Sequence, residues 1–210
     1  MSKAAGTGSI FTIGHSTRTI EAFVELLRTG GVRRVIDVRS IPRSRTNPQY
    51  NLDVLGEVLA AWQIGYSLIP ELGGRRGLQK TVAPEVNGFW KNQSFHNYAD
   101  YAMSGEFRTG LERLLASSAE MPCAIMCAEA VWWRCHRRII ADYLLNEGRR
   151  VLHLMGKDRI EPATLTPAAR SDHRVLVYPQ GNSDTGGTRS DVAKTDAAGR
   201  HLIKGATAAK

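Results

Sequence analysis

The stretch from Cys127 to Arg138, which reads CAEAVWWRCHRR, combines several side chains that can do chemistry. Cys127 and Glu129 follow an apolar segment directly, and Cys135 and His136 stand in the first turns of the next helical segment. The free N–H groups and the dipole at a helix N-terminus stabilise anions, which lowers the pKa of a cysteine and attracts phosphate or carboxylate groups. We therefore predict that Cys127 or Cys135 is a reactive thiolate. Glu129 and His136 are candidates for moving protons.

The same side chains are also zinc-ligand types, so a metal site is the alternative reading of this stretch. Structural zinc sites usually separate paired ligands by two to four residues, whereas seven residues separate Cys127 from Cys135. Adjacent residues on a helix, such as Cys135 and His136, point to different sides. We therefore expect no metal ligand here, with zinc left open. Cys123 is assigned to the core, because free cysteine is among the most buried residue types.

Other polar residues follow short apolar segments that read as strands. They are His15, Ser16, Asp37, Arg39, Ser44, Glu71, Gly73, Gly74 and Arg75. In open α/β sheets, ligands bind at the carboxyl ends of the strands. We therefore expect these residues to share one site with Cys127 and Glu129. His15 is predicted to pair with Asp37, as a base with the carboxylate that orients it, and His136 with Glu129 is the second candidate pair.

Arginines are dense around this predicted site. A guanidinium fork matches phosphate or carboxylate geometry, so several converging forks predict an anionic substrate held by a clamp of Arg39, Arg43, Arg75 and Arg137. Trp132 and Trp133 are expected to stack on a base. The full set of expected substrate-binding residues is Ser16, Arg39, Arg43, Ser44, Gly73, Gly74, Arg75, Tyr98, Trp132 and Arg137.

The hydrophobic pattern alternates between strands and helices along the chain. Strands are predicted over residues 10–13, 34–39, 66–69, 123–127 and 151–154. Helices are predicted near residues 20–27, 55–62, 98–103, 107–115 and 133–146. This order predicts the α/β class, with an open, mainly parallel sheet of about five strands and helices on both faces.

Composition limits the domain organisation and the partners. The 210 residues, 42% of them hydrophobic, predict a single α/β domain over residues 1–178. Residues 179–210 have almost no large apolar side chains and are expected to be a disordered basic tail. The net charge of +8 favours an anionic small molecule or nucleic acid as the partner. No apolar run reaches the roughly 20 residues of a membrane helix, and the N-terminus lacks a secretory signal, so we expect no membrane contact and a cytoplasmic location.

Taken in order, these motifs resemble the domain-of-unknown-function family 488 (DUF488). The matching stretches are residues 12–16, Asp37-Val38-Arg39 with Pro42 and Ser44, residues 72–74, Phe95 with Tyr98, and residues 126–129 with 135–137. The resemblance covers about residues 10–154. It implies a compact α/β core with these motifs as a shared site, and it implies no particular reaction.

Two functions are compatible with the predicted site. The first is an enzyme that acts on a phosphorylated or nucleic-acid substrate, either a thiol-dependent transferase or a hydrolase. The second is a non-catalytic module that binds nucleic acid or nucleotides. The chain has no GxGxxG or GxxxxGK[ST] motif, which argues against a dinucleotide cofactor or ATP, and the cofactor is otherwise unknown.

Overall fold

The computed structural model describes residues 8–172 and 174–181. Its main sheet has six strands in the order β3-β2-β4-β1-β5-β6. The strands are β1 (Ile10–Gly14), β2 (Arg34–Asp37), β3 (Gly65–Leu68), β4 (Cys123–Cys127), β5 (Val151–Gly156) and β6 (Arg159–Pro162). The first five run parallel and β6 pairs with β5 antiparallel, so the predicted open, mainly parallel sheet is confirmed.

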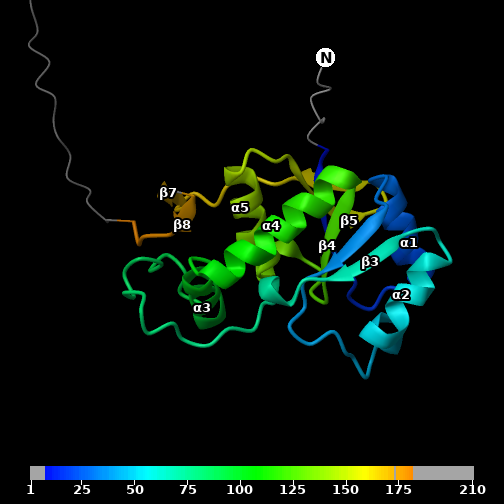
Figure 1. Cartoon of the computed structure of the whole chain (residues 1–210), viewed down its shortest axis with the longest axis horizontal. Helices are drawn as coiled ribbons and strands as arrows, with labels where there is room; N and C mark the ends of the chain where they lie inside the picture. Colours follow the sequence, from blue (N-terminus) through cyan, green and yellow to red (C-terminus); the bar gives the residue numbers. More distant parts are fainter. Residues whose placement is uncertain (1–7, 173, 182–210) are drawn as a thin grey trace, which may run out of the picture.

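Helices cover both faces of this sheet (Figure 1). One face carries α1 (Ile20–Thr29) and α2 (Leu52–Ala60), and the other carries α3 (Gln93–Tyr101), α4 (Gly105–Glu120) and α5 (Arg137–Asn146). The chain moves outward from β1 to β3 and then returns through β4 towards β5. Because crossovers are right-handed, this reversal of direction moves the helices to the opposite face. The reversal lies at β1 and β4, where ligands bind in such sheets.

Strand β4 shows how the sequence assigns side chains to the two faces. All five of its residues are buried, as expected for a central strand covered on both sides. Cys123, Ile125 and Cys127 pack in the core on the α5 side, whereas Ala124 and Met126 pack on the α1 side. This alternation directs the Cys127 side chain towards α5 at the carboxyl end of the strand.

The start of α5 differs from the prediction. A continuous helix was expected from residue 133, but Trp132–Arg134 form a short 3-10 helix and α5 begins only at Arg137. Between them, Cys135 has extended backbone angles, φ −132° and ψ 148°. The expectation that Cys135 and His136 point apart on a helix surface is therefore wrong, because Cys135 is not helical.

The segment after β6 folds against α5. It forms a hairpin of β7 (Arg170–Asp172) and β8 (Val175–Val177), which the sequence pattern did not predict. The buried Asp142 carboxylate accepts hydrogen bonds from the Thr166 amide (2.9 Å) and the Tyr178 hydroxyl (3.1 Å), which hold this segment in place.

The expected disordered tail begins at residue 179, and only its first three residues are described. Gln180 accepts a hydrogen bond from the Lys91 ammonium group at 2.8 Å. Residues 182–210 of the predicted tail lie outside the described residues. Within residues 8–172 and 174–181, no helix combines the length and the apolar character needed to cross a membrane.

Candidate functional site

A cavity of about 820 Å³ opens at the carboxyl ends of β1, β2 and β4. The expected site residues that line it are His15, Ser16, Arg39, Arg43, Ser44, Gly74, Arg75, Cys127, Glu129, Cys135 and His136. The expected residues that do not line it are Asp37, Glu71, Gly73, Tyr98, Trp132, Trp133 and Arg137. Strand ends that are more than a hundred residues apart in the sequence therefore meet at one cavity.

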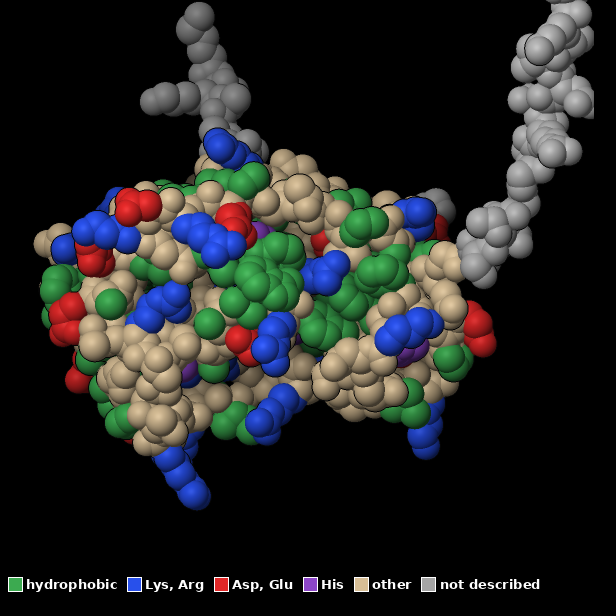
Figure 2. Space-filling view, turned by 180° about the vertical axis from the view of Figure 1, so that it is seen from behind, with side chains coloured by type: hydrophobic (Ala, Val, Ile, Leu, Met, Phe, Trp, Pro, Cys, Tyr) green, Lys and Arg blue, Asp and Glu red, His purple; other side chains and the backbone are tan. Residues whose placement is uncertain are grey.

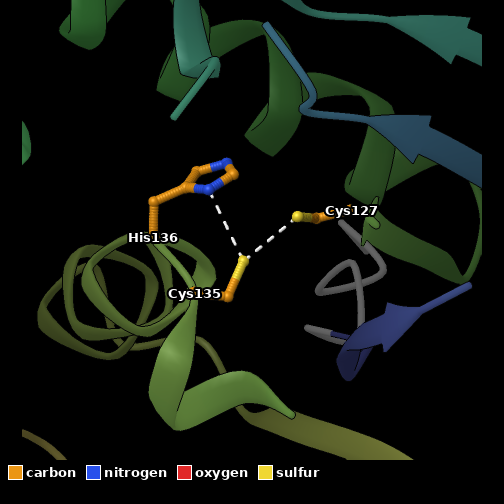
Figure 3. Close-up of side chains that lie close together, drawn as sticks. All are labelled: Cys127, Cys135 and His136. Atoms are coloured by element: carbon orange, nitrogen blue, oxygen red, sulfur yellow. Dashed lines mark hydrogen bonds between the residues drawn. The ribbon is translucent and has the colours of Figure 1, made fainter. Parts of the chain in front are cut away.

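Three side chains, Cys127, Cys135 and His136, form what we call the thiol–imidazole cluster (Figure 3). The sulfur of Cys135 lies 3.2 Å from the sulfur of Cys127 and 3.5 Å from Nδ1 of His136. Figure 3 shows the imidazole and the Cys127 thiol converging on the Cys135 sulfur from two sides. The two cysteines are only 8% and 4% exposed, so the cluster forms the buried end of the cavity.

The His136 ring is fixed by a backbone contact on its far side. Its Nε2 lies 2.9 Å from the carbonyl oxygen of Val38, which can only accept a hydrogen bond, so the neutral ring carries its proton on Nε2. Nδ1 faces the Cys135 sulfur, and it is unprotonated in the neutral ring and an N–H donor to the sulfur in the protonated ring. Gly74 packs directly against the ring, since a Cβ atom at this position would lie 2.3 Å from Nδ1. Gly74 therefore leaves space for this orientation of the imidazole.

The two thiols have opposite environments. Burial opposes ionisation of Cys135, but the hydrogen bond with the Cys127 thiol, the positive charge of the protonated form of His136 and the charge of Arg137 outweigh it and place the pKa of Cys135 well below its usual value. The hydrogen bond to Cys135, together with burial, raises the pKa of Cys127. Cys127 is therefore the thiol of the pair that keeps its proton.

Arg137 does not occupy the position expected of an anion-binding residue. Its side chain is 1% exposed, its Nε–H donates to the Cys135 sulfur at 3.3 Å, and its Nη2 donates to the Glu129 carbonyl oxygen. Arg137 is thus a buried partner of the sulfur atom and is not part of the cavity wall. This corrects the predicted clamp.

Asp37 and Arg39 form a buried ion pair below the cavity. Nη2 of Arg39 lies 2.6 Å from the Asp37 carboxylate, which also accepts a hydrogen bond from the Tyr66 hydroxyl at 2.8 Å. A further bond from Nη2 of Arg39 to the Tyr50 carbonyl oxygen measures 2.7 Å. Because most of its donors are engaged within the protein, Arg39 holds the strand ends together and has little capacity left for a substrate.

His15 does not pair with Asp37, because Arg39 lies between them. Nδ1 of His15 donates to the Ser16 carbonyl oxygen at 2.8 Å, and Nε2 accepts from Nη1 of Arg39 at 3.3 Å. Burial lowers the pKa of His15 to about 4. The ring is therefore neutral at physiological pH and both of its nitrogens are occupied, which is unlike a free general base.

The second expected pair, His136 with Glu129, is also not formed. The Glu129 carboxylate accepts a hydrogen bond from the Val131 amide at 3.4 Å and lines the cavity in a half-buried position. Its loop is held close to β1, since a Cβ atom on Gly14 would lie 2.0 Å from the Glu129 carbonyl oxygen. Among the residues that line the cavity, Glu129 is the only carboxylate.

Three exposed arginines, Arg43, Arg75 and Arg134, line the cavity. No hydrogen bond or ion pair within the described residues engages their guanidinium groups. Arg134, which was not among the expected substrate-binding residues, thus has the free guanidinium group at the cavity that was predicted for Arg137. We call these three residues the cavity arginines.

The aromatic and glycine residues at the cavity also differ from those predicted. Trp132 stacks on His153 at 4.4 Å, and Tyr98 is fully buried with its hydroxyl bonded to the Leu72 carbonyl oxygen, so neither ring reaches the cavity. Gly73 packs on Ser40. Phe95 lines the cavity instead. Phe95 lies in the first turn of α3, and apart from its place in the family motif nothing in the sequence indicated that it would line the cavity.

The open sheet and its carboxyl-edge cavity define an α/β protein with a buried thiol–imidazole cluster. The family model described as "domain of unknown function DUF488" matches residues 19–144, more than half of the chain. The chain belongs to this family, and the predicted resemblance is confirmed. The match begins after the motif at residues 12–16. No match to the chain was found among curated proteins or among solved structures.

Proposed function

We propose that this protein is an enzyme that acts on a phosphate-bearing substrate, with the Cys135 sulfur as the nucleophile. One observation carries the proposal. The sulfur lies 3.2 Å from the Cys127 sulfur and accepts a hydrogen bond from Arg137, and it opens onto the same cavity as the cavity arginines, which have no described partner. A sulfur atom stabilised as an anion, next to free guanidinium groups, suits covalent chemistry on an anionic substrate.

In this proposal the cavity arginines hold the phosphate and Cys135 attacks an electrophilic centre of the substrate. The sulfur supplies the electron pair for the new bond, and the electrons of the broken bond leave with the departing group. Glu129 begins this step as the protonated carboxyl group of the cavity wall and gives its proton to that group, which leaves Glu129 as a carboxylate. Glu129 then removes a proton from water, which displaces the sulfur and completes a hydrolysis. An acceptor other than water gives a transfer.

The charge of the chain also fits a nucleic-acid-binding module, but the surface gives this alternative less support. Figure 2 shows lysine and arginine side chains spread over one face among acidic and hydrophobic ones, with no continuous basic strip. Trp132, expected to stack on a base, is stacked on His153. We place the enzyme in the cytoplasm, because its proposed chemistry needs Cys127 and Cys135 to stay free thiols, as they are here.

The test is turnover against a panel of phosphorylated small molecules and short oligonucleotides. The matched variants are Cys135→Ser and Cys123→Ser, both at buried thiols, of which only the first lies at the cavity. We expect Cys135→Ser to lose about 10³-fold or more in kcat and Cys123→Ser to keep its activity. Binding of oligonucleotides without turnover by the unaltered protein would favour the non-catalytic module.

A further inference from the structure

We propose that the thiol–imidazole cluster binds a thiophilic divalent metal ion, of which Zn²⁺ is the natural probe. Cys127 and Cys135 would supply two sulfur ligands, and His136 would supply Nδ1. All three donor atoms lie within 4.8 Å of one another. Two thiolates and an imidazole are ligands that favour zinc over magnesium or calcium.

Two of the three distances within the cluster are close to those of a tetrahedral zinc site, and the third, between Cys127 and His136, lies within 4.8 Å. With Zn–S near 2.3 Å and Zn–N near 2.0–2.1 Å, two sulfurs lie about 3.8 Å apart and a sulfur and a nitrogen about 3.5 Å apart. The structure has 3.2 Å between the sulfurs and 3.5 Å between the Cys135 sulfur and Nδ1 of His136. A small movement of Cys127 away from Cys135 and towards His136 completes the geometry.

Residues around the cluster hold its ligand side chains in place, as the hydrogen-bond partners of metal ligands do in metal sites. A histidine that binds a metal usually donates its other N–H to a carbonyl or carboxylate, which fixes the tautomer. His136 makes this contact with the Val38 carbonyl oxygen at 2.9 Å. The Nε–H of Arg137 supports the Cys135 sulfur at 3.3 Å and offsets part of the negative charge that two thiolates bring.

The seven residues between Cys127 and Cys135 do not oppose this site. Cys127 ends β4, and Cys135 has an extended backbone just before α5, so both sulfurs reach the same point. The sequence-based objection assumed a helical Cys135. Short ligand spacings are typical of closed four-ligand structural sites, whereas a three-ligand site keeps one position open. Here the open position faces the cavity, which all three residues line.

Metal binding would change what the cluster can do. An ion on the Cys135 sulfur withdraws negative charge from it and makes it a weaker nucleophile, so metal binding opposes the proposed reaction. This consequence rests on the proposed function, under which Zn²⁺ is a reversible inhibitor of the enzyme. The binding site itself does not depend on that function.

The binding experiment uses the full chain, reduced with a phosphine and freed of metal. Zn²⁺ is titrated in competition with a chromogenic chelator, and Co²⁺ is added separately to look for the sulfur-to-cobalt charge-transfer band. We expect one equivalent of each metal. Cys127→Ser, Cys135→Ser and His136→Gln should each weaken Zn²⁺ binding by more than about 100-fold, since loss of an outer contact alone costs 10–100-fold. Cys123→Ser is the matched control and should bind as the unaltered protein does.

A second pair of variants leaves every ligand in place. Gly74→Ala puts a methyl group against Nδ1 of His136, whereas a Cβ atom at Gly77 meets nothing within 4 Å. We expect Gly74→Ala to weaken Zn²⁺ binding by about 10–100-fold and Gly77→Ala to leave it unchanged. Thermal unfolding without metal identifies the variants that remain folded. Zn²⁺ affinities of the glycine pair and of at least one folded variant among Cys127→Ser, Cys135→Ser and His136→Gln then show whether the cluster binds the metal.

The outcomes separate the metal site from the proposed enzyme. The metal site would be overturned, whatever the activity, by either of two results. One is binding of less than one equivalent of Zn²⁺, and the other is unchanged affinity in Gly74→Ala and in the folded variants of Cys127, Cys135 and His136. Stoichiometric, cluster-dependent binding supports the site even if no substrate is turned over. If a substrate is found, Zn²⁺ should abolish turnover and a chelator should restore it. Stimulation by Zn²⁺ would overturn the inhibitory role.

Discussion

The Nε–H of Arg137 donates a hydrogen bond to the sulfur of Cys135, although Arg137 is 1% exposed and carries a charge. Burying a guanidinium costs free energy unless its donors are matched. Here the sulfur and the Glu129 carbonyl oxygen accept from it. A buried cation at this position favours the anionic form of the sulfur and connects the start of α5 to the loop that follows β4.

Replacement of Arg137 by methionine should therefore slow the alkylation of Cys135 by iodoacetamide and reduce stability. We expect a loss of about 1–3 kcal/mol, because the Glu129 carbonyl oxygen is left without this donor. Arg138→Met is the control, since the Arg138 guanidinium bonds Thr166 and lies over Trp90. Alkylation rates and urea unfolding measure both effects. Equal alkylation rates in the two variants would contradict the assigned contact.

The Asp37–Arg39 pair should contribute far more to stability than a surface pair does. Asp37→Asn leaves a buried guanidinium without its counter-charge, and we expect it to cost about 3–5 kcal/mol. Glu120→Gln removes the exposed partner of Arg34, and it should cost less than about 1 kcal/mol. Urea unfolding of both variants is the measurement. A cost for Asp37→Asn no larger than that of Glu120→Gln would show that the buried pair is not stabilising the strand ends.

His153 should make stability depend on pH. Burial, with a smaller contribution from the charge of Arg137, lowers its pKa from 6.5 to about 4. Below pH 6.5 the unfolded chain takes up a proton that the folded ring resists until about pH 4, so the stability from the neutral ring is present above pH 6.5 and is lost as the pH falls. Between pH 7 and pH 5 we expect the free energy of unfolding to fall by about 1–2 kcal/mol less in His153→Gln than in the unaltered protein.

Unfolding curves of both proteins at several pH values check this prediction. His153→Gln keeps a side chain that can bond the Thr12 hydroxyl, which lies 2.7 Å from Nδ1 of His153. His15 titrates in the same range and remains in both proteins, so its contribution cancels in the comparison. Parallel stability–pH curves for the two proteins would contradict the neutral, buried state of His153.

The cavity arginines should control the binding of anions. Arg75→Ala and Arg134→Ala should each weaken the binding of pyrophosphate by about 10–100-fold, since each removes a charge-assisted hydrogen bond worth about 1.5–3 kcal/mol. Arg45→Ala is the control, because Arg45 is exposed in the same loop as Arg43 but does not line the cavity. Calorimetric titration at two salt concentrations measures the change. If Arg45→Ala weakened binding as much as the other two, general surface charge would explain the affinity.

The sheet and the meeting of its strand ends were predictable because hydrophobic alternation and the direction of crossovers depend on local sequence. The hydrogen-bond and ion-pair partners of individual side chains could not be predicted from the sequence. In the sequence, Arg39 and Arg137 resemble anion-binding residues. In the folded structure, the Arg39 guanidinium pairs with the buried Asp37 carboxylate and that of Arg137 bonds the buried Cys135 sulfur. The role expected of them falls instead to Arg134, which the 3-10 turn before Cys135 places at the cavity.

Two other differences have physical causes that the pattern does not encode. The helix around residue 133 has good helical spacing, but the extended Cys135 interrupts it where the sulfur contacts Cys127 and Arg137. The short strands β6 and β7 are mostly exposed, and β8 has only three residues, so none of them gives the alternation that marks a half-buried strand. In both cases tertiary contacts decide the local conformation.

The most direct measurement is the alkylation rate of each cysteine in the reduced, metal-free protein, resolved by peptide mass spectrometry with and without pyrophosphate. Cys135 should react at least about 10-fold faster than Cys127 and Cys123, because the thiolate is the reactive form and only Cys135 is stabilised as one. Pyrophosphate bound by the cavity arginines should slow that reaction. Equal rates at the three cysteines, or a Cys135 rate that pyrophosphate leaves unchanged, would contradict a nucleophilic sulfur in an anion-binding cavity.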